Sequence, residues 1–162
     1  MKEYTGSCHC GGVKYKFKSD ELVEIWSCNC SICDMVNYQH LFVKHELFEL
    51  IDGEELILEY NFESKSAKHF FCKKCGIKSF YQPRSHPEMY SINLKCVNDP
   101  PKVKEVVYFD GINFEDSPDR FLHVLKRRGN EDQPDGPKST QRQRGKLQVA
   151  KIVHSPERFD HF

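Results

Sequence analysis

The sequence lacks any long hydrophobic run. No segment approaches the roughly 18 apolar residues that a transmembrane helix needs, and Met1 to Gly12 contains no apolar region of the kind found in a secretory signal. We therefore expect a protein that does not enter the membrane and that stays in a reducing compartment, the cytoplasm or the nucleus.

The chain also lacks a net charge, because its 24 Lys and Arg residues balance 24 Asp and Glu residues. The charges are unevenly spread: residues 121–162 hold nine basic and five acidic residues, and residues 1–120 hold fifteen and nineteen. A basic tail can contact nucleic acid, chromatin or another acidic partner, or it can simply be solvated. We favour the solvated tail.

The segment from Asn130 to Gly145 has no large apolar residue and is rich in Gln, Pro, Asp, Gly, Ser, Thr and Arg. Such a segment cannot bury enough surface to offset the entropy lost on ordering it. We predict one domain at 1–128 and a polar, basic, flexible tail at 129–162. Four apolar residues of the tail could add a strand to the body or to a partner: Leu147, Val149, Ile152 and Val153.

Helical signals are scarce, whereas short strand signals recur. Val13, Tyr15 and Phe17 alternate with lysines, as in a strand with one buried face. Other strand candidates are Tyr38–Val43, Leu56–Tyr60, Ala67–Cys72, Lys78–Gln82, Met89–Val97 and Val103–Phe109. We expect one helical turn at Phe48–Leu50 and a short helix from Ser117 to Leu125, with Pro118 in its first turn. The pattern predicts a mainly β fold with few short helices.

Cysteine, by contrast, is plentiful: seven of the eight cysteines fall into three tight clusters. The clusters are Cys8-His9-Cys10, Cys28-Asn29-Cys30-Ser31-Ile32-Cys33 and Cys72-Lys73-Lys74-Cys75. Thiolates one or two residues apart can reach the same zinc ion, about 2.3 Å from each sulfur. Such near neighbours are poor disulfide partners, and a reducing compartment disfavours disulfides further. The clusters therefore indicate metal binding.

Cys8, Cys10, Cys72 and Cys75 supply four thiolates, which is a closed tetrahedral set. Gly76 follows the second pair and allows the chain to turn at positive φ, so that backbone N–H groups can point at sulfur. A redox dithiol is the alternative for the Cys72/Cys75 pair, but thioredoxin-like motifs belong to a βαβ context that this sequence lacks. We predict a structural zinc ion at this set.

The triplet Cys28, Cys30 and Cys33 supplies only three thiolates and leaves one coordination position open. Zinc in such a site can hold an incoming thiol as a thiolate near neutral pH, and that thiolate can attack a carbonyl carbon. In the alternative, a fourth protein ligand closes the site. The candidates for that ligand are His9, His40 and His69.

The remaining cysteine and two aromatic residues also bear on these sites. Cys96 shares strand parity with Ile92 and Leu94, so we predict a buried core thiol. Trp26 and Phe71 each adjoin a cysteine cluster. We expect them to exclude water from the metals; the alternative is an aromatic residue at the rim of a substrate pocket.

Four segments resemble blocks of the glutathione-dependent formaldehyde-activating enzyme family: Gly6–Val13, Cys28–Cys33, Phe71–Gly76 and Met89–Leu94, the last as found in its centromere protein V branch. The resemblance covers roughly residues 3–125. It implies a β-tent of small antiparallel sheets around two Zn²⁺ ions. It further implies a structural zinc at Cys8, Cys10, Cys72 and Cys75, and a catalytic zinc at Cys28, Cys30 and Cys33.

The activity that the resemblance implies is the condensation of glutathione with formaldehyde to S-hydroxymethylglutathione, grouped with carbon–sulfur lyases. We therefore expect a zinc-dependent enzyme that activates a small thiol. The alternative is a non-catalytic zinc-stabilised binding module that contacts chromatin, cytoskeleton or protein partners. Glutathione carries two carboxylates, which call for Arg or Lys groups near the triplet. The loop Asp34–Asn37 supplies none, and no short motif marks them elsewhere.

Overall fold

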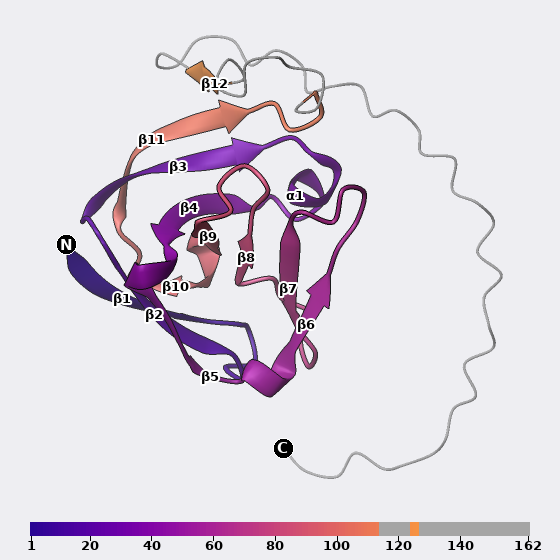
Figure 1. Cartoon of the computed structure of the whole chain (residues 1–162). Helices are drawn as coiled ribbons and strands as arrows, with labels where there is room; N and C mark the ends of the chain where they lie inside the picture. Colours follow the sequence, from indigo (N-terminus) through magenta and orange to yellow (C-terminus); the bar gives the residue numbers. More distant parts are fainter. Residues whose placement is uncertain (114–123, 127–162) are drawn as a thin grey trace, which may run out of the picture. The chain divides into compact units, whose positions relative to one another are not determined.

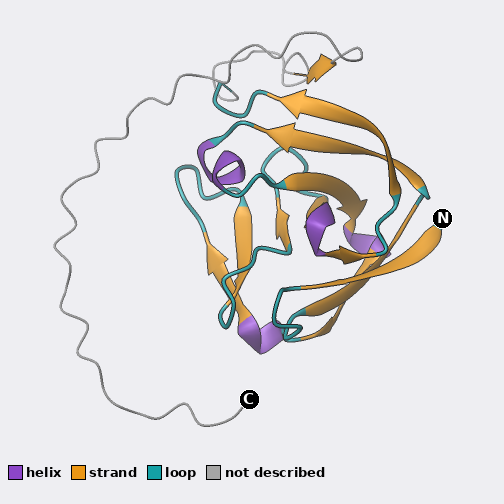
Figure 2. Cartoon of the chain, turned by 180° about the vertical axis from the view of Figure 1, so that it is seen from behind, coloured by secondary structure: helices purple, strands orange, loops and turns teal. Residues whose placement is uncertain are grey.

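A computed structural model describes residues 1–113 and the backbone of 124–126. Strands dominate this part of the chain (Figures 1 and 2). The strands are β1 (Lys2–Ser7), β2 (Lys14–Ser19), β3 (Leu22–Cys28), β4 (Gln39–Lys44), β5 (Phe48–Asp52), β6 (Ile57–Tyr60), β7 (Lys68–Cys72), β8 (Phe80–Gln82), β9 (Met89–Asn93), β10 (Val97–Asn98), β11 (Lys102–Phe109) and β12 (Val124–Lys126). The helical pieces are α1 (Ser31–Met35) and 3₁₀ turns at His45–Leu47, Glu54–Leu56 and Leu94–Cys96. The predicted mainly β class with few short helices is confirmed.

The strands form two sheets, of four strands in the order β10-β1-β2-β5 and of eight strands in the order β12-β11-β3-β4-β9-β8-β7-β6. The strands of both sheets pair antiparallel, as expected, except β3 and β11, which pair in parallel from Lys102 opposite Leu22 to Phe109 opposite Cys28. Figure 1 shows these two strands side by side with their arrows in the same direction. A parallel pair needs a long crossover connection, so local alternation along the chain could not predict it.

The alternation at β2 is confirmed. Tyr15 and Phe17 are buried, whereas Lys14 and Lys18 are exposed. Tyr15 packs its ring against Phe48 and Phe80 at centroid distances of 5.5 Å each. The contact with Phe80 joins the two sheets in one hydrophobic core, and such aromatic side chains bury large apolar areas.

Within residues 1–113, two of the expected local structures are wrong. Phe48–Leu50 is part of strand β5 rather than a helical turn, because its residues pair with β2, Phe17 lying opposite Phe48 and Tyr15 opposite Leu50. The expected strand Met89–Val97 breaks after Asn93. There the side chain of Asn93 accepts a hydrogen bond from the backbone N–H of Lys95 at 3.2 Å and caps a 3₁₀ turn.

The break after Asn93 also corrects the prediction for Cys96. This cysteine lies in the 3₁₀ turn and is half-buried, because strand parity with Ile92 does not continue through a turn. The helix expected from Ser117 to Leu125 is wrong at its end, where Val124 and Leu125 form strand β12 and pair with β11. Residues 117–123 and the predicted tail, 129–162, lie outside the described residues. Within the described part, no helix is long and apolar enough to cross a membrane.

Candidate metal centres and the adjoining cavity

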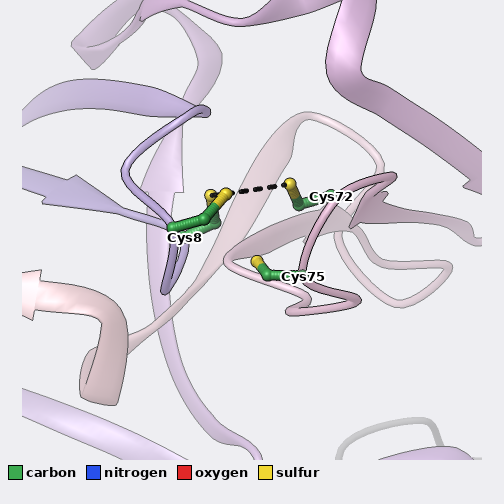
Figure 3. A group of neighbouring side chains, drawn as sticks. Cys8, Cys72 and Cys75 are labelled. Atoms are coloured by element: carbon green, nitrogen blue, oxygen red, sulfur yellow. Dashed lines mark hydrogen bonds between the residues drawn. The ribbon is translucent and has the colours of Figure 1, made fainter. Parts of the chain in front are cut away.

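In the structure, the pair Cys8/Cys10 and the pair Cys72/Cys75 come together from two distant parts of the chain, and we call these four residues the first cluster. The ligand atoms of Cys8, Cys10, Cys72 and Cys75 all lie within 4.8 Å of one another. The Sγ atoms of Cys8 and Cys10 are 3.5 Å apart, and those of Cys10 and Cys72 are 3.7 Å apart. In Figure 3 the sulfurs of the labelled cysteines converge from two separate loops. Tetrahedral bonds of about 2.3 Å to zinc place sulfurs roughly 3.8 Å apart, so this set fits one ion.

Each cysteine pair lies on a tight turn that points backbone N–H groups at sulfur. In the first turn, the N–H of Val13 donates to Cys8 Sγ at 3.3 Å, and in the second, Gly76 adopts φ 72° as predicted. Burial raises the pKa of Cys75, but backbone N–H groups of Ile77 and Cys10 outweigh it and lower this pKa to about 6. At Cys75 the turn therefore favours the thiolate that a metal binds.

The triplet lies where β3 ends and α1 begins. Cys28 is the last residue of β3, and Cys30 occupies the N-cap position of α1. Cys33 lies within that helix and is 2% exposed. The N–H of Cys30 donates to Cys28 Sγ at 3.4 Å. The thiols of Cys28 and Cys33 hydrogen-bond to Cys30 and hold its pKa well below the usual range, although burial opposes this. The pKa of Cys28 is raised by the same interactions.

One histidine joins the triplet. A ring nitrogen of His40 and the sulfurs of Cys28 and Cys33 lie within 4.8 Å of one another, in a group that does not include Cys30. Nδ1 of His40 is 2.9 Å from Ser91 Oγ, and Nε2 has no hydrogen-bond partner in the described part of the chain. Burial, and then Lys78, lower the pKa of His40 to about 3, so the ring is neutral and can bind a metal.

The other two candidates for a fourth ligand are placed differently. His9 is exposed and follows Cys8 in the first cluster. His69 is 2% exposed and lines the same cavity as the triplet, but it belongs to neither group of candidate metal ligands. The alternative of a closed second site therefore depends on His40.

A cavity of about 280 Å³ opens beside the triplet, and all three of its cysteines line the cavity. The lining includes five aromatic residues, Trp26, Phe42, Phe62, Tyr81 and Phe109. Trp26 stacks on Phe109 at a centroid distance of 5.3 Å and meets Phe42 edge-on at 5.1 Å. Trp26 is thus an aromatic residue of the pocket wall, which is the second of the two roles considered for it.

Comparison with known proteins bears on both clusters and the cavity. The model of the family described as glutathione-dependent formaldehyde-activating enzyme matches residues 3–109, more than half of the 162-residue chain. The chain belongs to this family. The family match does not distinguish the centromere protein V branch, which stays a prediction.

A solved structure supports the same relation. The crystal structure of a Rhodobacter sphaeroides protein, a structural genomics target, is 30% identical in sequence and has a TM-score of 0.56. The similarity covers 59% of this chain and 88% of that one. As a member of the formaldehyde-activating family, the chain has two groups that could hold metal ions, and both use predicted cysteines.

The sequence did not reveal that a buried lysine lies beside the triplet of this family member. Lys78 is 4% exposed, and its Nζ lies 4.4 and 4.5 Å from the ring centroids of Tyr38 and Tyr81. Burial lowers the pKa of Lys78, whereas the charges of the triplet thiolates raise it. Arg84 also lines the cavity. Basic groups near the triplet are therefore present, on a segment more than forty residues further along the chain.

Asn29 was also missed, although it lies inside the motif. Its Oδ1 accepts hydrogen bonds from the N–H groups of Gly111 at 2.7 Å and Ile112 at 3.2 Å, and its Nδ2 donates to Asp110 at 3.0 Å. A Cβ added at Gly111 would lie 2.5 Å from Cys28 Sγ. The Asp110-Gly111 segment is therefore hydrogen-bonded to Asn29 and packs directly against Cys28, so that only glycine fits at position 111.

Proposed function

We propose that the chain is a zinc-dependent enzyme that adds a small thiol, glutathione, to an aldehyde such as formaldehyde, as a carbon–sulfur lyase of the S-hydroxymethylglutathione synthase type. The observation that carries the proposal is the position of Cys28, Cys30 and Cys33 in the wall of one cavity, together with five aromatic residues. Cys8, Cys10, Cys72 and Cys75 would hold a structural ion at the first cluster, away from that cavity.

The triplet would hold the second ion and leave its fourth position to the thiol, with the ring of His40 beside the sulfurs of Cys28 and Cys33. A zinc ion bound there keeps a thiol deprotonated near neutral pH. The chain's own residues set the conditions for that chemistry. Lys78 places a positive charge near the three thiolates and favours their ionised form. The rings of Trp26, Phe42 and Phe109 line the cavity beside the sulfurs and make that part of its wall apolar.

The cavity suits a ligand of modest size. Small-molecule pockets commonly span about 300–1,000 Å³, and this cavity of about 280 Å³ lies at the lower end. Arg84 in its wall can bind a carboxylate through two parallel hydrogen bonds. Glu63 also lines the cavity and can bind the amino group of a thiol such as glutathione. Both groups support a charged thiol substrate rather than a purely apolar one.

The test substitutes one cysteine of the triplet and one outside both clusters. Cys30→Ser removes the thiolate that the neighbouring thiols favour most. We expect this variant to keep its fold and the first metal ion and to lose glutathione-dependent consumption of formaldehyde. Cys96→Ser, at a half-buried cysteine of the 3₁₀ turn, is the matched control and should keep both ions and full turnover.

The measurements are metal counting by mass spectrometry and the rate of formaldehyde loss with and without glutathione. Turnover that survives in Cys30→Ser would contradict the proposal. A wild-type protein without turnover, in which Cys30→Ser changes only stability, would instead support the binding-module alternative.

A further inference from the structure

His69 lies in the cavity wall and has no part in either cysteine cluster. Its ring is stacked between two aromatic rings, with Tyr81 at a centroid distance of 4.8 Å and an interplanar angle of 11°, and Phe62 at 5.4 Å and 26°. Stacking on these two rings leaves the imidazole little freedom to rotate out of its plane. The position of its two nitrogens is therefore fixed relative to the cavity.

Lys78 determines which nitrogen of His69 carries the hydrogen. Nζ of Lys78 lies 3.3 Å from Nδ1 of His69. An ammonium group has donors and no acceptor, so Nδ1 must accept this hydrogen bond and cannot itself be protonated. A neutral imidazole without hydrogen on Nδ1 carries it on Nε2.

The ring remains neutral in the folded protein. Burial, and then the charge of Lys78, lower the pKa of His69 to about 4. Lys78 is held in place by its contacts with Tyr38 and Tyr81, and the structure shows no ion pair between Lys78 and a carboxylate among residues 1–113. Lys78 and His69 together therefore give a neutral imidazole whose Nε2–H is a hydrogen-bond donor, and His69 is not a protonated acid.

The donor at Nε2 has no acceptor within the described residues, although the atom is buried. Leaving a buried donor unpaired destabilises the fold, so such a group in a native protein commonly binds a ligand or a water molecule. His69 and the triplet cysteines line one cavity. An oxygen atom of a molecule bound in that cavity would supply the missing acceptor for Nε2–H of His69.

We propose that Nε2–H of His69, with its tautomer fixed by Lys78, donates a hydrogen bond to the carbonyl oxygen of the aldehyde while a thiolate attacks the carbonyl carbon. This role rests on the proposed function. In the step, the C–S bond forms and the π pair of the C=O bond moves to oxygen. The proton that the thiol has lost is returned to that oxygen, which gives the hydroxymethyl thioether. His69 stabilises the negative oxygen and keeps its own proton.

The tautomer and the contact can be tested without turnover. Long-range ¹H–¹⁵N spectra of the zinc-loaded protein should show His69 protonated on Nε2 and not on Nδ1. Lys78→Met should abolish this preference. The probe is S-hydroxymethylglutathione, prepared by mixing glutathione and formaldehyde. We expect it to shift the Nε2–H resonance of His69 and to leave that of exposed His45 unchanged. An unshifted His69 resonance at saturating adduct overturns the proposal.

Kinetics test the role in the reaction. His69→Phe keeps a flat ring between Tyr81 and Phe62 and removes the donor, so kcat should fall about 10²-fold with little change in KM. His69→Gln retains an N–H donor and should recover part of kcat. His45→Phe, which keeps an aromatic ring against Tyr90, should behave as the wild type. Wild-type kcat in His69→Phe overturns the proposal. If the wild type shows no turnover while the Nε2–H resonance shifts, the proposed reaction fails and the hydrogen bond to the ligand stands.

Discussion

Gly111→Ala separates the metal affinity of the triplet from the stability of the fold. The added Cβ would lie 2.5 Å from Cys28 Sγ and 2.8 Å from Cys30 Cβ. Gly111 is not among the glycines with positive φ, so the substitution brings a steric clash and no backbone strain. The clash falls on two of the three predicted ligands of the second ion.

The size of the effect depends on whether Cys28 is bound to a metal ion, because the metal limits how far its sulfur can move. A carbon–sulfur contact needs roughly 3.5 Å or more, so Cys28 or residue 111 must move by about 1 Å. Without metal, Cys28 can turn its thiol away, and the loss should be near 1 kcal/mol, the lower end for overpacking. With metal, the sulfur must stay within about 0.2 Å of its coordination distance. We therefore expect metal affinity at the triplet to fall about 10–100-fold, comparable to the loss of an outer-shell partner.

Competition with a coloured chelator measures the two sites separately, because each ion is released at its own chelator concentration. Gly111→Ala should weaken one ion and leave the other at wild-type affinity. Gly76→Ala is the matched control, since its added Cβ meets nothing within 4 Å but would lie at φ 72° beside Cys75. That variant should weaken the other ion instead. Two ions of wild-type affinity in Gly111→Ala would refute the reasoning.

Two further predictions concern stability. Tyr38→Phe removes the 2.8 Å hydrogen bond from the Tyr38 hydroxyl to the Ser91 carbonyl in a fully buried site. Urea unfolding should show that the free energy of unfolding falls by about 1–2 kcal/mol, with both metal ions retained. An unchanged unfolding midpoint would contradict this prediction. Burial lowers the pKa of His69 to about 4, so below pH 6.5 the unfolded chain binds a proton that the folded chain does not. This contribution to stability is complete above pH 6.5 and is lost as the pH falls toward 4, by about 1.4 kcal/mol per pH unit. The free energy of unfolding of His69→Phe should have a shallower pH dependence by that amount, and identical slopes would refute the assignment.

The cysteine groups could be predicted from sequence because their members occur as pairs or a triplet within a few consecutive residues. Spacing alone identifies Cys28, Cys30 and Cys33 as one group, and the clustering of Cys8 and Cys10 with Cys72 and Cys75 needed only the arithmetic of a four-ligand site. The alternation at Tyr15 and Phe17 was equally local. These signals do not depend on which strands become neighbours.

The cavity could not be predicted because strand pairing builds it. His40 reaches the triplet because it lies opposite Trp26 in the β3–β4 pair, and His69 reaches Tyr81 because β7 and β8 pair at that register. Lys78 precedes β8, and no periodicity marks it as a buried cation. Whether a histidine binds metal, donates a hydrogen bond or packs in a core depends on neighbours that are distant in the sequence.

The first cysteine cluster has a consequence for how the chain folds. Cys8 and Cys10 follow β1 of the four-stranded sheet, whereas Cys72 ends β7 of the eight-stranded sheet, 62 residues after Cys10. Cross-linking a loop of that length removes roughly 4 kcal/mol of chain entropy from the unfolded ensemble. An ion captured early would therefore bring the two sheets together before most long-range contacts exist. The supply of metal during synthesis would then set the rate of folding, as well as the stability of the finished protein.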